Sequence, residues 1–405
     1  MKARIVVLLA VVGPWLLAGL SDDDPAGITT YSILGAEHGY RLLWVLLLST
    51  VALVVFHGLG ARMGVATGQG LIGLVRERSG VRVGIAALAA LLVANIGTTC
   101  AEFAGVAAAF ELAGVSRYVS VPIAAVAVSL LVLTGSFRRI EHVLLLLAAV
   151  FATYLAAGFL ARPSWAEAGR GLVVPSLPLT RDALLIATAT VGTTLAPWGL
   201  AFVQSYVADK RLSPKDMSYV RADVVTGSVL TGVIGVMVVI ACAATLHVTG
   251  HSINEAKDAA VALEPLAGGL ASTLFGVGLV GAALLAASIL PLSTAYSVCE
   301  AVGVEASLDD RPREAPVFYA TYGLVTIVAV AIVLFPGAAL VPILFLSQVL
   351  NAILLLPLMV LILGAARDRS LMGELVIGRA TSIVGTLCVG LVALCIVTLG
   401  LLAIV

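Results

Sequence analysis

Residues 21–27 read SDDDPAG and place three adjacent carboxylates directly before a proline, with a glycine two residues later. The preceding residues, Ile5–Leu20, carry no charge, and the residues that follow are again mostly apolar. An ionisable side chain at membrane depth costs about 2.5–3.5 kcal/mol on insertion scales and marks a functional site by default. Proline removes a helical hydrogen-bond donor and clashes with the preceding turn. Asp24 is therefore the leading candidate for a functional carboxylate at a break in a helix.

The composition is that of an integral membrane protein. The 405 residues are 61% hydrophobic and 11% charged, with a mean hydropathy of +1.12, whereas soluble domains carry about 25% charged residues. No basic patch interleaved with aromatic residues suggests nucleic acid as a partner. No nucleophile–base pairing or phosphate-binding loop suggests an enzyme, so we expect no catalytic residues and no cofactor.

The chain is long enough to cross a bilayer many times, since one helical span needs about 20 apolar residues. The apolar segments predict a single all-α transmembrane domain, residues 1–405, with eleven spans joined by short connections. They lie at residues 5–37, 41–65, 83–113, 118–135, 140–161, 183–207, 221–247, 265–303, 315–335, 338–365 and 380–404.

The distribution of Lys and Arg supports this count and gives an orientation, because cytoplasmic loops carry an excess of both. With the N-terminus inside, the outer connections hold only six of them: Arg41, Arg117, Arg162, Arg170, Arg181 and Lys257. The other seventeen fall inside. We therefore expect a multi-pass protein of the plasma membrane with a cytoplasmic N-terminus and an extracellular C-terminus, in contact with lipid and functional as a monomer.

The first and sixth spans are interrupted by proline and glycine, at DPAG (24–27) and APWG (196–199). Interrupted helices at corresponding places in two halves point to an inverted-repeat transporter with its site at the midplane. The breaks lie five spans apart. Because the chain reverses its direction across the membrane with each span, an odd separation places equivalent spans of the two halves in opposite orientations. The predicted repeats are residues 5–161 and 183–365, with 380–404 as an extra helix.

Collinear motifs along most of the chain resemble those of the NRAMP divalent-metal transporters. The first span is similar to the family's DPGN segment, TTCAEFAG (98–105) to its TDLAEVIG-like third span, and VGTTLAPWG (191–199) to its GTTVMPHN pattern. ARMGVATGQGLIGLVRER after the second span and FLSQVLNAILLLPL with DRSLMGE near the end extend the likeness. The resemblance implies a LeuT-like fold of two inverted five-helix repeats plus one helix.

The resemblance also implies the metal ligands. Asp24 occupies the position of the family's aspartate, and the backbone carbonyls of Ser21 and Thr193 occupy its carbonyl-ligand positions. Two ligands are replaced: the asparagine position holds Gly27 and the methionine position holds Ala196. A thioether is a soft ligand that favours later transition metals. Its loss in a widened site favours Mg²⁺, which keeps several waters and needs only one or two carboxylates.

Further departures affect proton transfer. The family's histidines after the sixth-span proline fall on Trp198 and Val203, and the aspartate of its third-span acidic pair falls on Thr99. Only Glu102 remains of that pair, either as a carboxylate near the site or as a structural hydrogen-bonding group. The pattern resembles the NRAMP-related magnesium transporters, which move Mg²⁺ and Mn²⁺ without proton coupling.

Other polar residues carry two possible roles. Asp23 could be a ligand or part of the aqueous entrance, where we place Asp22 because carboxylates there would attract cations. Gln348 matches a family residue close to the metal but could equally join two helices. Asn95 and Asn351 are more typical of packing or water contact than of ligation.

The sequence therefore predicts an uncoupled magnesium and manganese transporter working by alternating access. The alternative is a proton-coupled manganese or iron transporter of the ordinary NRAMP type. A sodium-coupled carrier of organic solutes and a metal sensor are weaker alternatives. Near the span ends, Glu111 and Glu300 are expected to pair with loop arginines.

Overall fold

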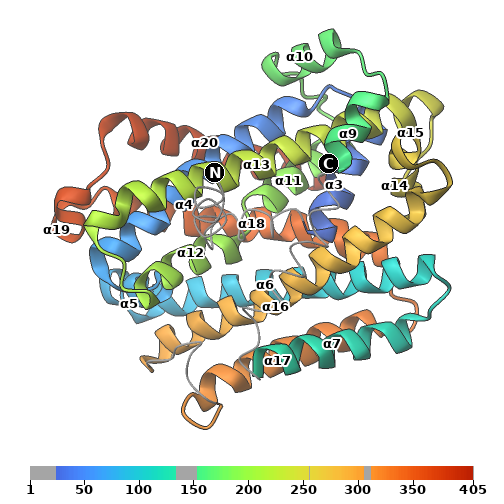
Figure 1. Cartoon of the computed structure of the whole chain (residues 1–405). Helices are drawn as coiled ribbons and strands as arrows, with labels where there is room; N and C mark the ends of the chain where they lie inside the picture. Colours follow the sequence, from blue (N-terminus) through green and yellow to red (C-terminus); the bar gives the residue numbers. More distant parts are fainter. Residues whose placement is uncertain (1–23, 134–152, 255, 305–311, 405) are drawn as a thin grey trace, which may run out of the picture.

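The computed structural model describes residues 24–133, 153–254, 256–304 and 312–404. Within these ranges every regular element is helical (Figure 1). The helices are α3 (Pro25–His38), α4 (Leu43–Thr67), α5 (Leu71–Ser79), α6 (Val81–Leu112), α7 (Arg117–Leu133), α9 (Thr153–Leu160), α10 (Trp165–Val173), α11 (Arg181–Thr194), α12 (Pro197–Asp209), α13 (Met217–Cys242), α14 (Ala256–Ala260), α15 (Glu264–Ala267), α16 (Ala271–Val302), α17 (Pro316–Val333), α18 (Leu340–Ala366), α19 (Arg369–Met372) and α20 (Arg379–Ile404).

Eight helical segments in these ranges are long and apolar enough to cross a membrane. They correspond to predicted spans two, three and six to eleven, and α7 is a shorter apolar helix at the fourth. The first and fifth predicted spans fall partly on residues 1–23 and 134–152, outside the described ranges. The total of eleven spans and the division into repeats therefore stay predictions.

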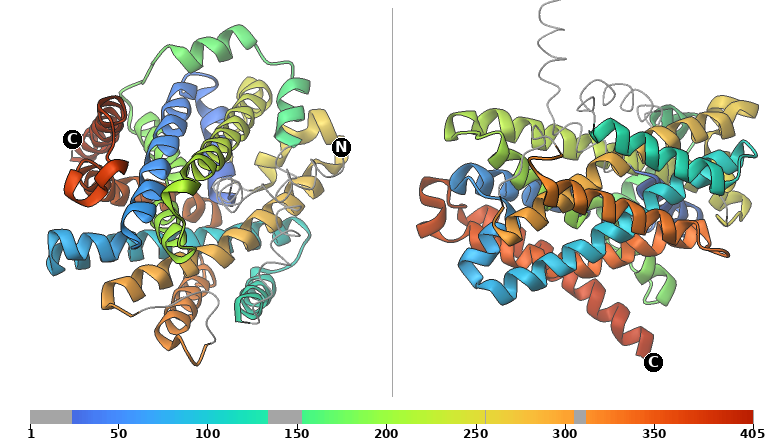
Figure 2. Two further views of the ribbon diagram at one scale, coloured as in Figure 1. Left: turned by 60° about the vertical axis from the view of Figure 1, so that its left-hand side comes forward. Right: turned by 90° about the horizontal axis from the view of Figure 1, so that it is seen from below.

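The sixth span forms the centre of the bundle. Its helices α11 and α12 lie among α3, α4, α6, α16 and α18 (Figures 1 and 2). In its most apolar window, 94% is buried inside the protein, against 22% for α20 at the periphery. A segment buried on all sides must satisfy its polar groups within the protein, which makes this span the natural place for a functional break.

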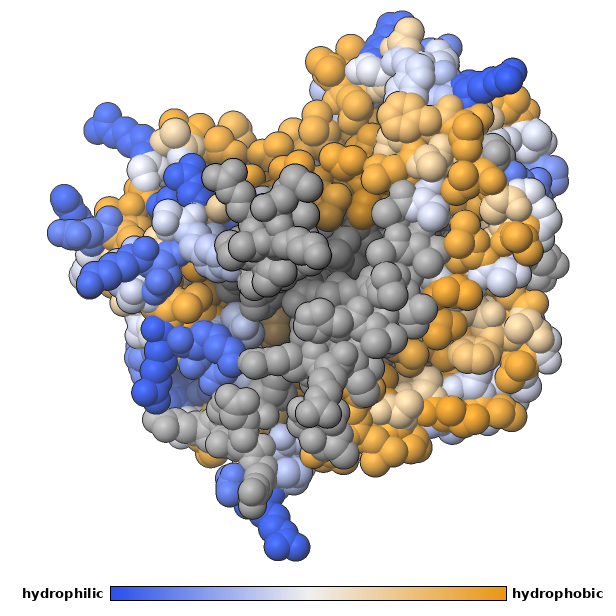
Figure 3. Space-filling model, viewed as in Figure 1, coloured by the Kyte–Doolittle hydropathy of each residue, from blue (hydrophilic) through white to orange (hydrophobic). Residues whose placement is uncertain are grey.

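Apolar side chains also cover much of the outside (Figure 3). Ile123 on α7, Leu324 on α17 and Leu387 on α20 are each more than 60% exposed. Large exposed apolar surfaces mark protein or membrane contacts. Their spread over several peripheral helices is the arrangement expected of a surface in contact with lipid.

Glycine lets the central helices approach closely. A Cβ on Gly192 of α11 would lie 1.9 Å from the carbonyl oxygen of Gln348 on α18. A Cβ on Gly105 of α6 would lie 2.4 Å from the Cβ of Pro25, the first residue of α3. Small residues at membrane helix interfaces permit such backbone contact. These two contacts fix α18 and α6 against the two broken spans.

Gly192→Ala is accordingly expected to destabilise the bundle. The obstructing atoms belong to the backbone and cannot rotate away, so the cost should be about 1–3 kcal/mol, as for other overpacked interiors. Thermal unfolding in detergent measures it. Gly58→Ala is the matched control because a Cβ there meets no atom within 4 Å, and equal unfolding temperatures for the two variants would contradict the prediction.

Candidate metal site at the two helix breaks

Two helices of the core begin in the same way. Asp24 and Ala196 have extended backbones (φ −75°, ψ 171° and φ −70°, ψ 137°) and are followed by the prolines that open α3 and α12. Proline suits the first helical position because its fixed φ is helical and no intrahelical donor is needed there. The two breaks are thus built alike, as the sequence predicts, with an aspartate at one and an alanine at the equivalent position of the other.

The break in the sixth span leaves a carbonyl without its helical donor. α11 ends at Thr194 and α12 starts at Pro197. In a continuous helix the carbonyl of Thr193 would accept from the N–H of residue 197, which proline lacks. This supplies a physical reason for the predicted carbonyl ligand at Thr193. Its hydroxyl is also buried without a hydrogen-bond partner among the described residues.

Asp24 is only 4% exposed and caps α3. Its Oδ1 accepts a hydrogen bond from the backbone N–H of Gly27 at 2.5 Å. The positive end of the helix dipole favours a carboxylate at this position. The cap fixes the orientation of Asp24 and leaves its other oxygen, Oδ2, outside that bond.

Glu102 on α6 lies close enough to Asp24 for the two carboxyl groups to influence each other electrostatically. The Glu102 side chain is fully buried, and neither of its oxygens has a hydrogen-bond partner within bonding distance among the described residues. The contact of Gly105 with Pro25 brings this face of α6 onto the start of α3. Burying carboxylates without a counter-charge is costly, so the pair forms an environment that a cation would stabilise.

Glu102 belongs to a polar stripe on α6 that also contains Asn95, Thr98 and Thr99, all buried. Spacings of three and four residues put them on one helix face. Asn95 donates from Nδ2 to the hydroxyl of Thr294 at 2.8 Å, while its Oδ1 has no partner among the described residues. Thr99 donates to the carbonyl of Asn95 at 2.7 Å. The stripe thus contains both side chains that bond to neighbouring groups and side-chain oxygens, on Asn95 and Glu102, that have no partner among the described residues.

Gln348 on α18 is part of a side-chain network. Its Oε1 accepts from Nδ2 of Asn351 at 2.9 Å, and its Nε2 donates to the Ser347 hydroxyl at 3.0 Å. Asn351 also donates to the hydroxyl of Thr98 on α6 at 2.9 Å. Both hydrogen bonds of Gln348 stay within α18, and it is Asn351 that joins this helix to α6. The Oε1 of Gln348 accepts one hydrogen bond and has a second lone pair, so ligation of a metal is compatible with this network.

Ala196 and Trp198 pack against α16. Both are at most 4% exposed and belong to an apolar cluster with Leu285, Ala286 and Ile289. The indole N–H of Trp198 has no partner among the described residues, and its carbonyl accepts from the Ser293 hydroxyl at 3.1 Å. This face of the break is therefore apolar and supplies neither a thioether nor a titratable group.

Three predicted site residues, Ser21, Asp22 and Asp23, lie outside the described residues. Within the described ranges no three His, Cys, Asp or Glu side chains gather where they could hold one metal ion. A metal at the breaks would accordingly depend on Asp24, with Glu102 nearby and neutral oxygen donors completing its coordination.

The two broken spans are linked directly by a contact that the sequence did not predict. The hydroxyl of Tyr31 on α3 lies 3.0 Å from that of Thr194, the last residue of α11, within hydrogen-bond distance. The Thr194 hydroxyl also donates to the Thr190 carbonyl at 2.8 Å. A tyrosine one to two turns after a predicted break was the available signal.

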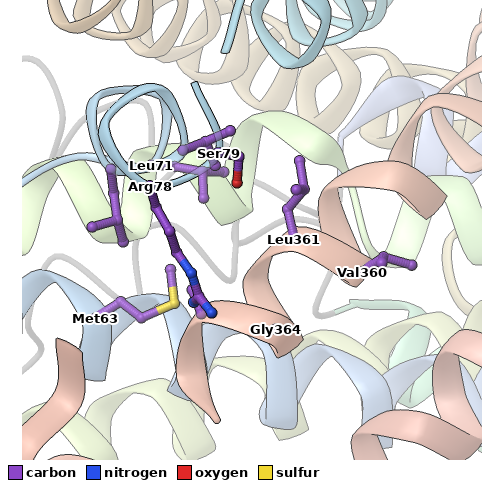
Figure 4. Close-up of a pocket in the computed structure, with 10 residues that line it drawn as sticks. Met63, Leu71, Arg78, Ser79, Val360, Leu361 and Gly364 are labelled. Atoms are coloured by element: carbon purple, nitrogen blue, oxygen red, sulfur yellow. The ribbon is translucent and has the colours of Figure 1, made fainter. Parts of the chain in front are cut away.

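Two cavities lie away from the breaks. One of about 480 Å³ opens at the end of α3, the start of α11 and the segment that follows α13, and its lining includes Glu37, His38, Asp182 and His247. The other, of about 140 Å³, lies among α4, α5 and α18, with Met63 and Arg78 along it (Figure 4). Arg78 also forms an ion pair with Asp368 at 3.1 Å. The first cavity is lined mainly by polar and titratable side chains at the end of α3.

The comparisons with known proteins settle the family. The family model described as "Natural resistance-associated macrophage protein-like" (Nramp) matches residues 15–402. The chain belongs to the Nramp family. Nramp proteins are transporters rather than enzymes, in agreement with the sequence prediction.

Two similar relatives are divalent metal cation transporters named MntH. The protein from Burkholderia ambifaria is 32% identical over 293 residues, which is 69% of this chain and 65% of that protein. The protein from Yersinia enterocolitica is 28% identical over 390 residues, covering 95% of this chain and 92% of the relative.

Solved structures confirm the LeuT-like fold of this Nramp chain. A manganese transporter from Eremococcus coleocola aligns with a TM-score of 0.75 at 20% identity, covering 98% of this chain and 87% of that one. MhsT, solved with L-phenylalanine, aligns at 0.65 with 14% identity, covering 96% and 98%. At these identities the likeness concerns the fold alone.

Proposed function

We propose that this Nramp chain transports divalent metal cations across the plasma membrane by alternating access, binding them at Asp24. The observation that carries this is the buried, capped carboxylate of Asp24 at one helix break, with Glu102 beside it. At the other break, the carbonyl of Thr193 faces Pro197 in the sequence instead of a helical N–H donor. Because the cell interior is electrically negative, the membrane potential would favour cation uptake by about 2.3 kcal/mol per charge per 100 mV.

Manganese is the substrate that the relatives support. The similar structure from Eremococcus coleocola is named a manganese transporter, and the similar curated proteins are named divalent metal cation transporters. Carboxylate and carbonyl oxygens suit Mn²⁺ as well as Mg²⁺ and Ca²⁺. An all-oxygen site at Asp24 is compatible with this assignment.

Magnesium is a second substrate, favoured by one specific observation. Ala196 stands where a thioether would act as a ligand and packs into an apolar cluster, so no soft atom faces the break from this position. Without a soft ligand, the site loses its main reason to reject a hard cation. The cation would retain several waters, as Mg²⁺ usually does in proteins.

Transport without proton coupling is the mechanism that we favour over the proton-coupled alternative. Trp198, Val203 and Thr99 are buried, and none of them titrates near neutral pH. Glu102 is the remaining titratable side chain known to adjoin Asp24. A proton leaving the site therefore has few titratable side chains among the described residues to pass along.

Proteoliposomes loaded with a pH-sensitive dye test this mechanism. We expect Mn²⁺ and Mg²⁺ uptake driven by an inside-negative potential, with the same rate in the presence and absence of a pH gradient. Empty liposomes are the control for leakage. Stoichiometric acidification of the interior during Mn²⁺ uptake would establish the proton-coupled alternative instead.

A further inference from the structure

Glu300, in the last turn of α16, forms hydrogen bonds with two other elements far from the helix breaks. Its Oε1 accepts from the hydroxyl of Ser205 on α12 at 2.5 Å. Its Oε2 accepts from the backbone N–H of Ile72 at 3.2 Å, and the N–H of Gly73 also interacts with the carboxylate. Ile72 and Gly73 belong to the first turn of α5, where backbone N–H groups and the helix dipole favour an anion.

The chain leaves space for this carboxylate at Gly70. A Cβ at residue 70 would lie 1.7 Å from Oε1 of Glu300 and 2.1 Å from its Cδ. The backbone of Gly70 is extended (φ −75°, ψ 171°) and open to any residue. Glycine is therefore required here for space, and the start of α5 is shaped around the Glu300 side chain.

Further hydrogen bonds join the same elements. Gln204 on α12 donates from Nε2 to the carbonyl of Gln69, just before α5, at 3.0 Å. Arg76 on α5 donates to the carbonyl of Ala301 on α16 at 2.5 Å. The ends of α12 and α16 and the start of α5 thus form one polar junction, at the end of the molecule that the charge distribution assigns to the cytoplasm.

This junction is mechanically connected to the candidate metal site. Ser205 lies on α12, the half-helix that begins at the Ala196–Pro197 break. α12 also packs along α16 and contacts α5. A movement of α12 that opened the site toward the junction would have to break the hydrogen bond between Ser205 and Glu300.

We propose that Glu300 is a positioning residue that latches α12 and α5 to α16 and holds the cytoplasmic side of the metal site closed. The effect of the latch on transport rests on the proposed transport function, since alternating access requires this side to open and close. The latch itself is a property of the three helices. Loss of the carboxylate shifts the equilibrium toward the state with that side open.

Hydrogen exchange measured by mass spectrometry tests the latch on the full-length protein in detergent. In Glu300→Gln we expect exchange of the amides in 69–79 and in 197–209 to rise by about tenfold, as for loss of one charge-assisted hydrogen bond. Exchange in α4 should not change. Glu111→Gln is the control for removing a carboxylate, because Glu111 instead pairs with Arg117 at 2.9 Å.

Two glycine variants separate the latch from general destabilisation. Gly70→Ala retains Glu300 but displaces its carboxylate, so it should reproduce the exchange pattern of Glu300→Gln. Gly73→Ala places a methyl group at an ordinary 3.7 Å from the Cβ of Glu300 and should match the wild type. This pair keeps the test decisive even if Glu300→Gln does not fold.

Transport gives a second readout in proteoliposomes with external Mn²⁺. If fewer molecules face outward, the apparent KM for external Mn²⁺ should rise severalfold in Glu300→Gln and Gly70→Ala, since the fraction able to bind falls. Increased exchange confined to α5, or different behaviour of these two variants, would overturn the latch. Absence of Mn²⁺ uptake by the wild type, with the expected exchange pattern, would instead overturn only the transport function.

Discussion

Asp24→Asn should abolish divalent metal uptake and leave the first helix break intact. Asparagine caps helices about as well as aspartate, so the amide oxygen can still accept the N–H of Gly27 that Oδ1 accepts now. The variant loses the charge that would face the cation. Removing one partner of a buried charge pair costs about 3–5 kcal/mol, which corresponds to a loss of at least about 100-fold in binding.

Initial rates of Mn²⁺ and Mg²⁺ uptake into proteoliposomes measure this effect, normalised to the amount of reconstituted protein. Asp24→Ala provides a useful comparison because it removes both the charge and the cap, and the cap contributes about 1 kcal/mol. We expect both variants to be inactive but only Asp24→Ala to unfold at a lower temperature. If Asp24→Asn retained more than a tenth of the wild-type rate, Asp24 would not be the principal ligand.

The positions of the helix breaks could be predicted because they depend on local chemistry. Pro25 and Pro197 stop any helix that enters from the N-terminal side, whatever the surroundings, and the structure starts α3 and α12 at these two residues. The positions of the spans could also be predicted from the sequence alone, because bilayer thickness sets the length of each apolar run. The described helices match those runs to within a few residues, apart from the later start of α16.

The partners of polar side chains could not be predicted, because they depend on which helix faces cross. Glu111 pairs with Arg117, as expected from a loop arginine nearby in the sequence. Glu300 forms no ion pair with a loop arginine among the described residues, contrary to the same expectation; its hydrogen bonds come from Ser205 and from backbone groups of α5. Ser205 is 95 residues away, and only packing of α12 on α16 brings the two together.

The helix contact around Glu102 illustrates the same limit. The sequence position of Glu102 identified it as an acid inside the membrane. That it lies next to Asp24 depends on the contact between Gly105 and Pro25, which the sequence does not show. Gln348, for which a ligand role and a helix-joining role were equally open, bonds to Ser347 and Asn351 on its own helix. The link from this network to α6 is made by Asn351 and Thr98. A residue type limits the possible chemistry, and the helix crossing selects among the possibilities.

Ala196→Met should turn the site toward manganese. The new thioether would stand at the start of α12, at the break in the sixth span, and soft ligands favour later metals over Mg²⁺. Combined with Gly27→Asn, it would also narrow the site. We expect the ratio of Mn²⁺ to Mg²⁺ uptake to rise by about tenfold, equivalent to about 1.4 kcal/mol of differential binding.

Ala196→Leu separates ligand chemistry from size, since leucine adds a similar volume without sulfur. Residue 196 packs against Leu285, Ala286 and Ile289, so either substitution could cost about 1–3 kcal/mol in overpacking, and the stabilities of the two variants should be similar. Competition between Mn²⁺ and Mg²⁺ in the same proteoliposomes removes differences in reconstitution, because both ions encounter the same molecules. If methionine alone shifts the ratio, the missing thioether sets the tolerance of hard cations. If leucine shifts it equally, the volume at residue 196 controls selectivity and the soft-ligand explanation is wrong.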